Sequence, residues 1–310
     1  MRFGLAPKWA RMKLAAERGA MALKITPTKA TLGALVHGID LARLDDETFA
    51  TIEAAWHDFG ILIFPEQNLS EAAHVAFSRR FGILERNVTA NDVGDNPEVV
   101  VLSNVKDGGG LWAPDSDHGL FLKGNCYWHT DSSFKRVPAK GSILSARIVS
   151  SVGGETEYAD MRAAYDALAP GMQEFLRDKV AVHSYAYSQG LIGGMGALSQ
   201  DEWDAVPPVE HPLIRTHPAT GRRSLYIGRH ASHIVGENVE ESRGLLRRLC
   251  EQACRPPRVY KHCWRAGDMV MWDNRCVLHR GHDHPSDQPR HMVRTTIAGE
   301  SVANEWQLPA

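Results

Sequence analysis

Trp128-His129-Thr130-Asp131-Ser132-Ser133-Phe134 is the segment around which the rest of this 310-residue chain is arranged. In an extended strand successive side chains alternate between the two faces, so residues two apart point the same way. We therefore expect a strand here, with the imidazole of His129 and the carboxylate of Asp131 directed at one point. Two groups do not hold a catalytic metal, so a third ligand is expected from elsewhere in the chain.

The best candidate for that third ligand is His279, in the segment Trp272-Asp273-Asn274-Arg275-Cys276-Val277-Leu278-His279-Arg280-Gly281. Two histidines and one carboxylate on one face of an octahedron leave three positions open, as in non-haem Fe(II) oxygenases. The sequence thus predicts His129, Asp131 and His279 as the metal ligands of a catalytic centre. A zinc hydrolase could use the same three ligands, but no nearby acid is obviously placed as its general base.

Composition indicates an ordinary globular protein. The chain is 43% hydrophobic and 23% charged, which permits a sizeable core. A formal net charge of -2 gives no general electrostatic case for nucleic acid or an anionic membrane, and no stretch approaches the roughly 20 apolar residues of a membrane helix. The five cysteines are odd in number and scattered, which favours reduced thiols in the cytoplasm over a disulfide framework or a zinc site.

The first 20 residues differ from the rest because they carry five basic side chains and one acid. They contain no apolar core of secretory length and no cleavage-like pattern of small residues. Met21 is followed by Ala-Leu-Lys-Ile-Thr-Pro, which is typical of a natural domain start. We predict a disordered basic extension at residues 1–20 and a single domain at residues 21–310.

From Met21 onward, short apolar strands alternate with a few capped helices. There is no βαβ rhythm and no repeat of 20–50 residues, which favours a mostly β, double-sheet fold with appended helices. Residues 105–127 are predicted to be an irregular lid and residues 189–208 a loose segment. The expected strands are 23–25, 35–39, 61–64, 99–102, 142–148, 156–158, a hairpin of 211–217 with 224–227, 259–264 and 269–272; the expected helices are 45–58, one starting at 70, 160–168, 170–179 and 238–254.

Over about residues 25–299 these features resemble the taurine dioxygenase/2,4-dichlorophenoxyacetate dioxygenase (TauD/TfdA) family of Fe(II)- and 2-oxoglutarate-dependent oxygenases. The resemblance implies a double-stranded β-helix core of the jelly-roll, cupin-like type. Within the family, Pro207-Pro208-Val209 and the segment 229–236 favour the phenoxyalkanoate (2,4-D) branch. The motifs that carry the resemblance are 60–67, 128–134, 153–158, 160–168 and 272–281.

The resemblance also implies roles for four further residues. Arg290, eleven residues after His279, would bind the distal carboxylate of 2-oxoglutarate through the two parallel donors of its guanidinium. Thr156 would be the hydroxyl partner of that carboxylate, and Asn125 a further residue near the cosubstrate or substrate. Arg294 would lie on the same side as Arg290 if this segment is a strand, and would anchor the anionic end of the substrate. Arg294 could instead form a structural salt bridge, and Asn125 could merely satisfy a loop backbone.

Several other histidines are open to two interpretations. His230 and His233 form a His-x-x-His pair that could suggest a second metal, but polar packing or lining of a substrate pocket is the preferred interpretation. His118 in the lid and His282 and His284 beside a proline are expected to be solvated.

The activity implied by the resemblance is hydroxylation of a small anionic substrate with Fe(II), 2-oxoglutarate and O2. The substrate is expected to be an aryloxyalkanoate such as 2,4-dichlorophenoxyacetate, cleaved to a phenol and a 2-oxo acid with release of succinate and CO2, in the degradation of aromatic compounds. The lid side chains Leu111, Trp112, Phe121 and Leu122 would cover its aromatic body or form the lid's own core. A taurine or alkylsulfonate dioxygenase, another small-carboxylate hydroxylase of the family, and a non-enzymatic cupin-like binding module remain as alternatives. A homo-oligomer is expected.

Overall fold

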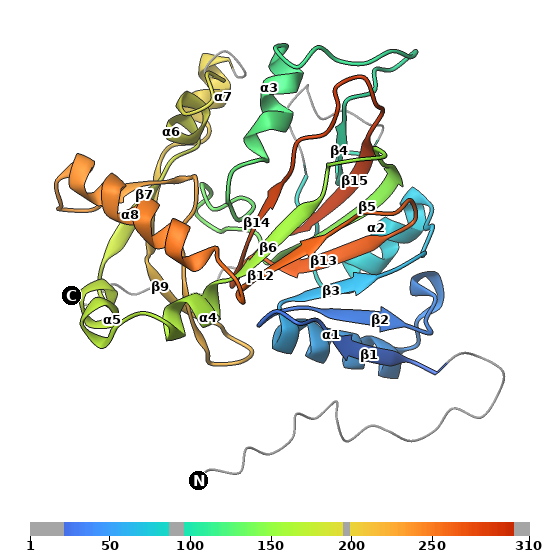
Figure 1. The fold of residues 1–310 in the computed structure, drawn as a ribbon, viewed down its shortest axis with the longest axis horizontal. Helices are drawn as coiled ribbons and strands as arrows, with labels where there is room; N and C mark the ends of the chain where they lie inside the picture. The colour runs from blue at the N-terminus through green and yellow to red at the C-terminus, as the bar shows by residue number, and fades with distance from the viewer. Residues whose placement is uncertain (1–21, 87–95, 195–198, 301–310) are drawn as a thin grey trace, which may run out of the picture.

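A seven-stranded β-sheet is the largest element of the computed structural model, which describes residues 22–86, 96–194 and 199–300. The predicted extension at residues 1–20 lies outside these ranges. The strands occur in the order β1-β2-β3-β13-β5-β15-β4 (Figure 1), and only β2 and β3 pair in parallel. Their bounds are β1 (Lys24–Pro27), β2 (Ala34–His37), β3 (Ile61–Phe64), β13 (Met269–Asp273), β5 (Gly141–Ile148), β15 (His291–Ile297) and β4 (Val99–Ser103).

Strand β3 is apolar and buried at every position, because both of its faces are covered. In β3, Leu62 and Phe64 belong to one core cluster, whereas Ile61 and Ile63 belong to another on the opposite face. The same alternation continues in β13, which pairs antiparallel with β3. The sheet is therefore covered on both sides.

Two helices pack on the outer face of the sheet, where Figure 1 shows them behind the strands. Helix α1 (Asp46–Phe59) is capped by Asp45, whose side chain accepts a hydrogen bond from the backbone N–H of Thr48. Helix α2 (Glu71–Arg79) is capped by Ser70 in the same way. Side-chain caps of this kind satisfy backbone donors that the helix itself leaves unpaired, and both helices start where the sequence predicts.

A three-stranded sheet in the order β12-β6-β14 faces the inner side of the large sheet. Its strands are β12 (Val259–His262), β6 (Thr156–Asp160) and β14 (Val277–Gly281). Tyr158 of β6 and Trp272 of β13 pack with their ring centroids 5.6 Å apart. The two layers thus share one apolar core, and β6 and β14 carry residues of the candidate site.

Several of the remaining elements pack into a third core cluster beside this pair of sheets, against Ala159 and Leu278. The prediction of one strand over residues 211–217 is wrong, because the chain forms two strands there, separated by Leu213. The first, β8 (Val209–Pro212), pairs with β7 (Val180–His183). The second, β9 (Ile214–Thr216), forms the expected hairpin with β10 (Arg223–Leu225). No helix among the described residues is long and apolar enough to span a membrane. The bounds are α4 (Met161–Asp166), α5 (Pro170–Leu176), β7 (Val180–His183), α6 (Tyr185–Gly190), α7 (Gln200–Asp204), β8 (Val209–Pro212), β9 (Ile214–Thr216), β10 (Arg223–Leu225), β11 (Ala231–Ile234) and α8 (Val239–Ala253).

Three local predictions need correction. The lid is not wholly irregular, because Ser116 caps a helix, α3 (Asp117–Gly124), by accepting from the backbone N–H of Gly119. The loose segment 189–208 contains the end of α6 and all of α7, while residues 195–198 lie outside the described chain. The predicted strand at His129–Asp131 is only an isolated bridge between His129 and His279, followed at once by a turn.

Candidate active site

The backbones of His129 and His279 hydrogen-bond to each other, which brings their side chains together. The N–H of His129 donates to the carbonyl of His279 at 3.0 Å, and the N–H of His279 donates back at 2.8 Å. Their ring centroids are 4.1 Å apart. Asp131 lies close to both rings, with Oδ1 3.9 Å from His129 Nε2 and Oδ2 3.8 Å from His279 Nε2. These distances are too long for hydrogen bonds and leave room for a shared ion.

A buried polar network fixes the segment that carries Asp131. The side-chain oxygen of Asn274 accepts from Thr130 Oγ1, from the backbone N–H of Asp131 and from the indole N–H of Trp272. Its amide nitrogen donates to Ser142 Oγ, which in turn donates to Asp131 Oδ2 at 2.7 Å. Partners of this kind orient a ligand carboxylate. Asn274 and Ser142 received no role from the sequence, although Asn274 lies in a quoted motif.

The turn that follows Asp131 is made by a non-glycine residue in the left-handed region, since Ser132 has a φ of 55°. Such conformations cost of order 1–3 kcal/mol and persist where the surroundings enforce them. The Ser132 hydroxyl donates to Glu85 at 2.8 Å, and this contact helps to hold the turn. The chain therefore turns at the carboxylate instead of continuing as a strand.

The electrostatics of the three residues suit ligands that must be unprotonated. Burial lowers the pKa of His279 to about 4, and burial and the neighbouring His279 lower the pKa of His129 well below its ordinary value. Burial alone would raise the pKa of the Asp131 carboxyl, but Arg294 and the two histidines outweigh it and hold that pKa below its usual range. The site thus combines two neutral imidazoles with one carboxylate.

The donor set fits a divalent metal ion. One donor atom from each of His129, Asp131 and His279 lies within 4.8 Å of the others, and all three residues are buried. His129 Nδ1 contacts the carbonyl of Tyr127 at 2.7 Å, an outer contact that leaves Nε2 for the centre of the cluster. His279 Nδ1 is buried and has no hydrogen-bond partner among the described residues. Imidazole and carboxylate ligands suit iron and related metals.

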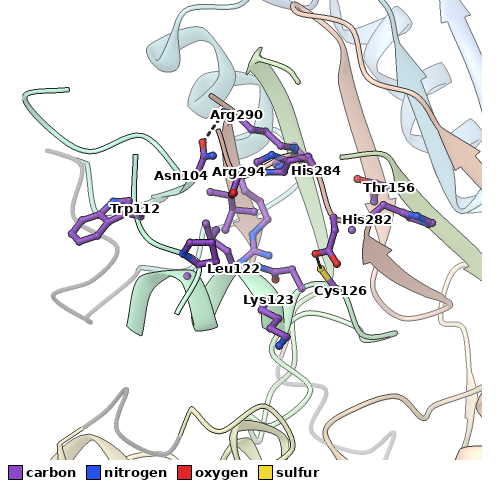
Figure 2. A pocket seen from close by; sticks show the side chains of 18 of the residues that line it. Asn104, Trp112, Leu122, Lys123, Cys126, Thr156, His282, His284, Arg290 and Arg294 are labelled. Carbon is purple, nitrogen blue, oxygen red and sulfur yellow. Dashed lines mark hydrogen bonds between the residues drawn. The ribbon is translucent and has the colours of Figure 1, made fainter. Parts of the chain in front are cut away.

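A cavity of about 490 Å³ opens beside this cluster and is lined by both predicted arginines (Figure 2). Volumes of this size accommodate small molecules. Arg290 and Arg294 reach it from the β15 segment, and Thr156 reaches it from the start of β6. Three cationic side chains, the two arginines and Lys123, line the cavity against one acid, Asp283. Its charge therefore favours anions.

Arg290 is half-buried, and both its backbone and the end of its side chain are held by hydrogen bonds. Its backbone N–H donates to Asn104 Oδ1 at 2.8 Å, and a terminal guanidinium nitrogen donates to the carbonyl of Gly154 at 3.1 Å. A Cβ on Gly154 would lie 3.0 Å from Arg290 Nε, so this glycine leaves space for the side chain. Among the described residues no carboxylate pairs with Arg290. Neither Asn104 nor Gly154 was singled out from the sequence.

The other predicted residues also line the cavity, with different partners. Arg294 donates to Asp131 Oδ1 at 2.7 Å, so the salt bridge considered as an alternative is present. Thr156 Oγ1 accepts from the indole N–H of Trp264 at 2.8 Å. Asn125 ends α3, and its backbone carbonyl accepts from the N–H of Gly281 at 2.8 Å.

The five additional histidines are not simply solvated. His282 and His284 line the cavity, contrary to expectation, and His118 Nε2 contacts the carbonyl of Ser103 at 2.7 Å. His230 is buried, with Nδ1 2.9 Å from Ser188 Oγ, and His233 contacts Ser232. The last two belong to different hydrogen-bond pairs, in agreement with polar packing.

A second group of potential metal ligands consists of His217, Asp273 and Cys276. Its contacts indicate a structural role rather than a metal site. His217 Nε2 lies 2.9 Å from Asp273 Oδ2, and Arg275 binds both oxygens of Asp273 at 2.8 and 2.6 Å. Burial raises the pKa of the Cys276 thiol to about 12, so it stays protonated. A carboxylate saturated by a guanidinium and a protonated thiol do not favour a cation.

Comparison with known proteins agrees with this arrangement. A profile of the family described as "Taurine catabolism dioxygenase TauD, TfdA family" matches residues 24–296. This chain belongs to that family.

Relatives within the TauD/TfdA family align over nearly their whole length. An (S)-phenoxypropionate/α-ketoglutarate dioxygenase of Sphingobium herbicidovorans is 42% identical, over 91% of this chain and 97% of the relative. A 2,4-dichlorophenoxyacetate dioxygenase of Cupriavidus pinatubonensis is 39% identical, over 91% of this chain and all of the relative. The crystal structure of AAD-2 in complex with Mn(II) and N-oxalylglycine has a TM-score of 0.84 and 39% identity, and covers 93% of this chain and 100% of that chain.

Proposed function

We propose that this protein is an Fe(II)- and 2-oxoglutarate-dependent dioxygenase that hydroxylates a small aryloxyalkanoate. The observation that carries the proposal is the buried cluster of His129, Asp131 and His279 at a cationic cavity of about 490 Å³. These three residues would hold the iron. With 2-oxoglutarate and O2, the iron would supply oxidative decarboxylation to succinate and CO2, coupled to hydroxylation of a substrate C–H bond.

The tail of 2-oxoglutarate is assigned to Arg290 and Thr156. Arg290 is a half-buried residue whose guanidinium uses one terminal nitrogen on a backbone carbonyl and pairs with no carboxylate of the described chain. Leaving such a charge unpaired is unfavourable, and a bidentate carboxylate is its natural counter-ion. Thr156 lines the same cavity and can donate its hydroxyl proton. Asn125 is proposed as a further contact to the cosubstrate.

Arg294 is proposed to recognise the carboxylate of the substrate. It donates to Asp131 through one terminal nitrogen, and its buried Nε has no partner in the part of the chain that the structure describes. The guanidinium therefore has donors left for an anion while it orients Asp131. An anion at this position would lie beside the three proposed ligands, which limits hydroxylation to carbons a few bonds away.

The aromatic part of the substrate would lie against the apolar wall contributed by the lid. Trp112 and Leu122 line the cavity, and Figure 2 shows them on the side away from Thr156. Hydroxylation of the carbon between carboxylate and ether oxygen would give a hemiacetal. Its hydroxyl proton transfers to the ether oxygen as the C–O bond breaks, which releases a phenol and leaves a 2-oxo acid.

Taurine or an alkylsulfonate is the second candidate, because a sulfonate would satisfy Arg294 equally well. It would leave the apolar wall of Trp112 and Leu122 without a partner. A non-enzymatic binding module is disfavoured because it has no need for three buried ligand groups. The purified enzyme, loaded with Fe(II), should release phenol from an aryloxyacetate or aryloxypropionate faster than sulfite from taurine. Clear sulfite without phenol would reject this substrate class.

The broader setting is also a proposal. The pairing of a seven-stranded with a three-stranded sheet around the site supports a jelly-roll, cupin-like core. The single profile match over residues 24–296 supports one domain at residues 21–310. All five cysteines are free of disulfides, which supports a reducing cytoplasm. We expect a homo-oligomer, and light scattering on the purified protein would determine its state.

A further inference from the structure

We infer that Trp264 is a positioning residue, which aims the hydroxyl proton of Thr156 at the distal carboxylate of 2-oxoglutarate. The inference rests on the proposed function and deepens it. Trp264 follows β12, does not line the cavity and received no role from the sequence. Its indole N–H donates to Thr156 Oγ1 at 2.8 Å.

This contact restricts the directions in which the Thr156 hydroxyl can donate. An indole N–H can only donate, whereas a hydroxyl has one proton and two acceptor lone pairs. With one lone pair engaged by Trp264, the proton of Thr156 is left for another acceptor. Thr156 is 3% exposed and lines the cavity that also contains Arg290.

The fold holds Trp264 in place for this contact. Its ring packs edge-on against His262, with centroids 4.6 Å apart and planes at 89°. His262 pairs with Thr156 across the β12–β6 ladder. His262 Nε2 lies 3.1 Å from Asp268 Oδ2, and the same oxygen accepts from the backbone N–H of Arg265 at 3.0 Å. The residue following Trp264 is thus tied through Asp268 to His262, whose strand pairs with the one that carries Thr156.

A donor oriented before the ligand arrives loses less conformational freedom on binding than a freely rotating one. Removal of the indole N–H should therefore weaken the binding of 2-oxoglutarate without changing the metal ligands. A Trp264→Phe variant keeps an aromatic ring against His262 and removes the donor. We expect its dissociation constant for 2-oxoglutarate to rise about 3- to 10-fold, the range for one neutral hydrogen bond.

A double-mutant cycle separates this role from general packing. Isothermal titration of 2-oxoglutarate into the full-length, Mn(II)-loaded protein would be carried out for wild type, Trp264→Phe, Thr156→Val and the double variant. If Trp264 acts through Thr156, the double variant binds no more than about twofold weaker than Thr156→Val. In a Thr156→Ser background, which keeps the hydroxyl, Trp264→Phe should again weaken binding. Mn(II) affinity should be the same in all variants.

Additive losses in the double variant, or unchanged 2-oxoglutarate affinity in Trp264→Phe, would overturn the inference. If Trp264→Phe does not fold, Trp264→Gln provides a donor without the ring, and it should bind 2-oxoglutarate more tightly than Trp264→Leu. Equal or weaker binding by Trp264→Gln would overturn the inference too. If the wild-type protein binds no 2-oxoglutarate, the proposed function itself is rejected. If the wild type binds it and substitutions of Trp264 do not change the affinity, only this inference is rejected.

Discussion

Replacement of Arg290 by alanine should selectively weaken binding of 2-oxoglutarate. The Arg290 guanidinium lines the cavity, donates to the carbonyl of Gly154 at 3.1 Å and has no carboxylate partner in the described chain. Burial lowers its pKa, yet arginine remains charged at any physiological pH. Its unused donors are therefore available to a carboxylate from outside the protein.

The expected loss of affinity follows from the charged hydrogen bonds that Arg290 would no longer make to 2-oxoglutarate. A hydrogen bond to a charged group contributes about 1.5–3 kcal/mol, and each 1.4 kcal/mol is tenfold in affinity. Arg290→Ala should thus raise the dissociation constant for 2-oxoglutarate roughly 10- to 150-fold in calorimetric titrations of the Mn(II)-loaded protein. Arg290→Lys should fall between wild type and alanine, since lysine keeps the charge and loses the planar fork.

Arg280 offers a matched control for this experiment. It lies near the site but pairs with Glu157 at 2.7 Å and does not line the cavity. Arg280→Ala should leave 2-oxoglutarate affinity within about threefold of wild type. If Arg290→Ala instead left this affinity unchanged and weakened only the aryloxyalkanoate, the two arginines would have exchanged roles and the assignment would be wrong.

Three further predictions concern the metal, the substrate and pH. His129→Ala or His279→Ala should abolish Fe(II)-dependent succinate formation in a protein with wild-type circular dichroism, because each removes a proposed ligand; normal succinate formation would refute the triad. Arg294→Ala should lose phenol release from an aryloxyalkanoate, and retained release at wild-type KM would contradict its role. Burial lowers the pKa of His74 to about 3 and of His211 to about 4, so the unfolded chain binds more protons below about pH 6.5. The free energy of unfolding should therefore fall as pH drops from about 6.5 toward those values, by up to about 1.4 kcal/mol per pH unit for each group. Denaturant titrations near pH 7.5 and 5 measure this, and equal stabilities would contradict it.

Elements set by local chemistry were predictable from the sequence. Asp45, Ser70 and Asn238 each accept from a backbone N–H two or three residues ahead, and each helix starts next to its cap. The β3 strand has its predicted bounds because an apolar run of four residues ends at a proline. Helix α3 was missed although Ser116 and Asp117 supply a cap and a first-turn acid, because glycines at both ends obscured it.

Features that depend on pairing between distant segments were less accessible. The proximity of His129 and Asp131 was predicted from strand alternation, but the structure produces it through a bridge to His279 and a left-handed turn at Ser132. The contact of Trp264 with Thr156 spans 108 residues and requires the β12–β6 ladder. Spacing along one chain contains no information about such a pairing.

The most direct test of the central claim is an anaerobic titration of the purified protein with Fe(II) and 2-oxoglutarate, followed by visible absorption. The account predicts a charge-transfer band that requires both additions and is absent from the His129→Ala variant. A wild-type protein that binds Fe(II) and 2-oxoglutarate without such a band, or an equal band in His129→Ala, would contradict the proposed iron centre.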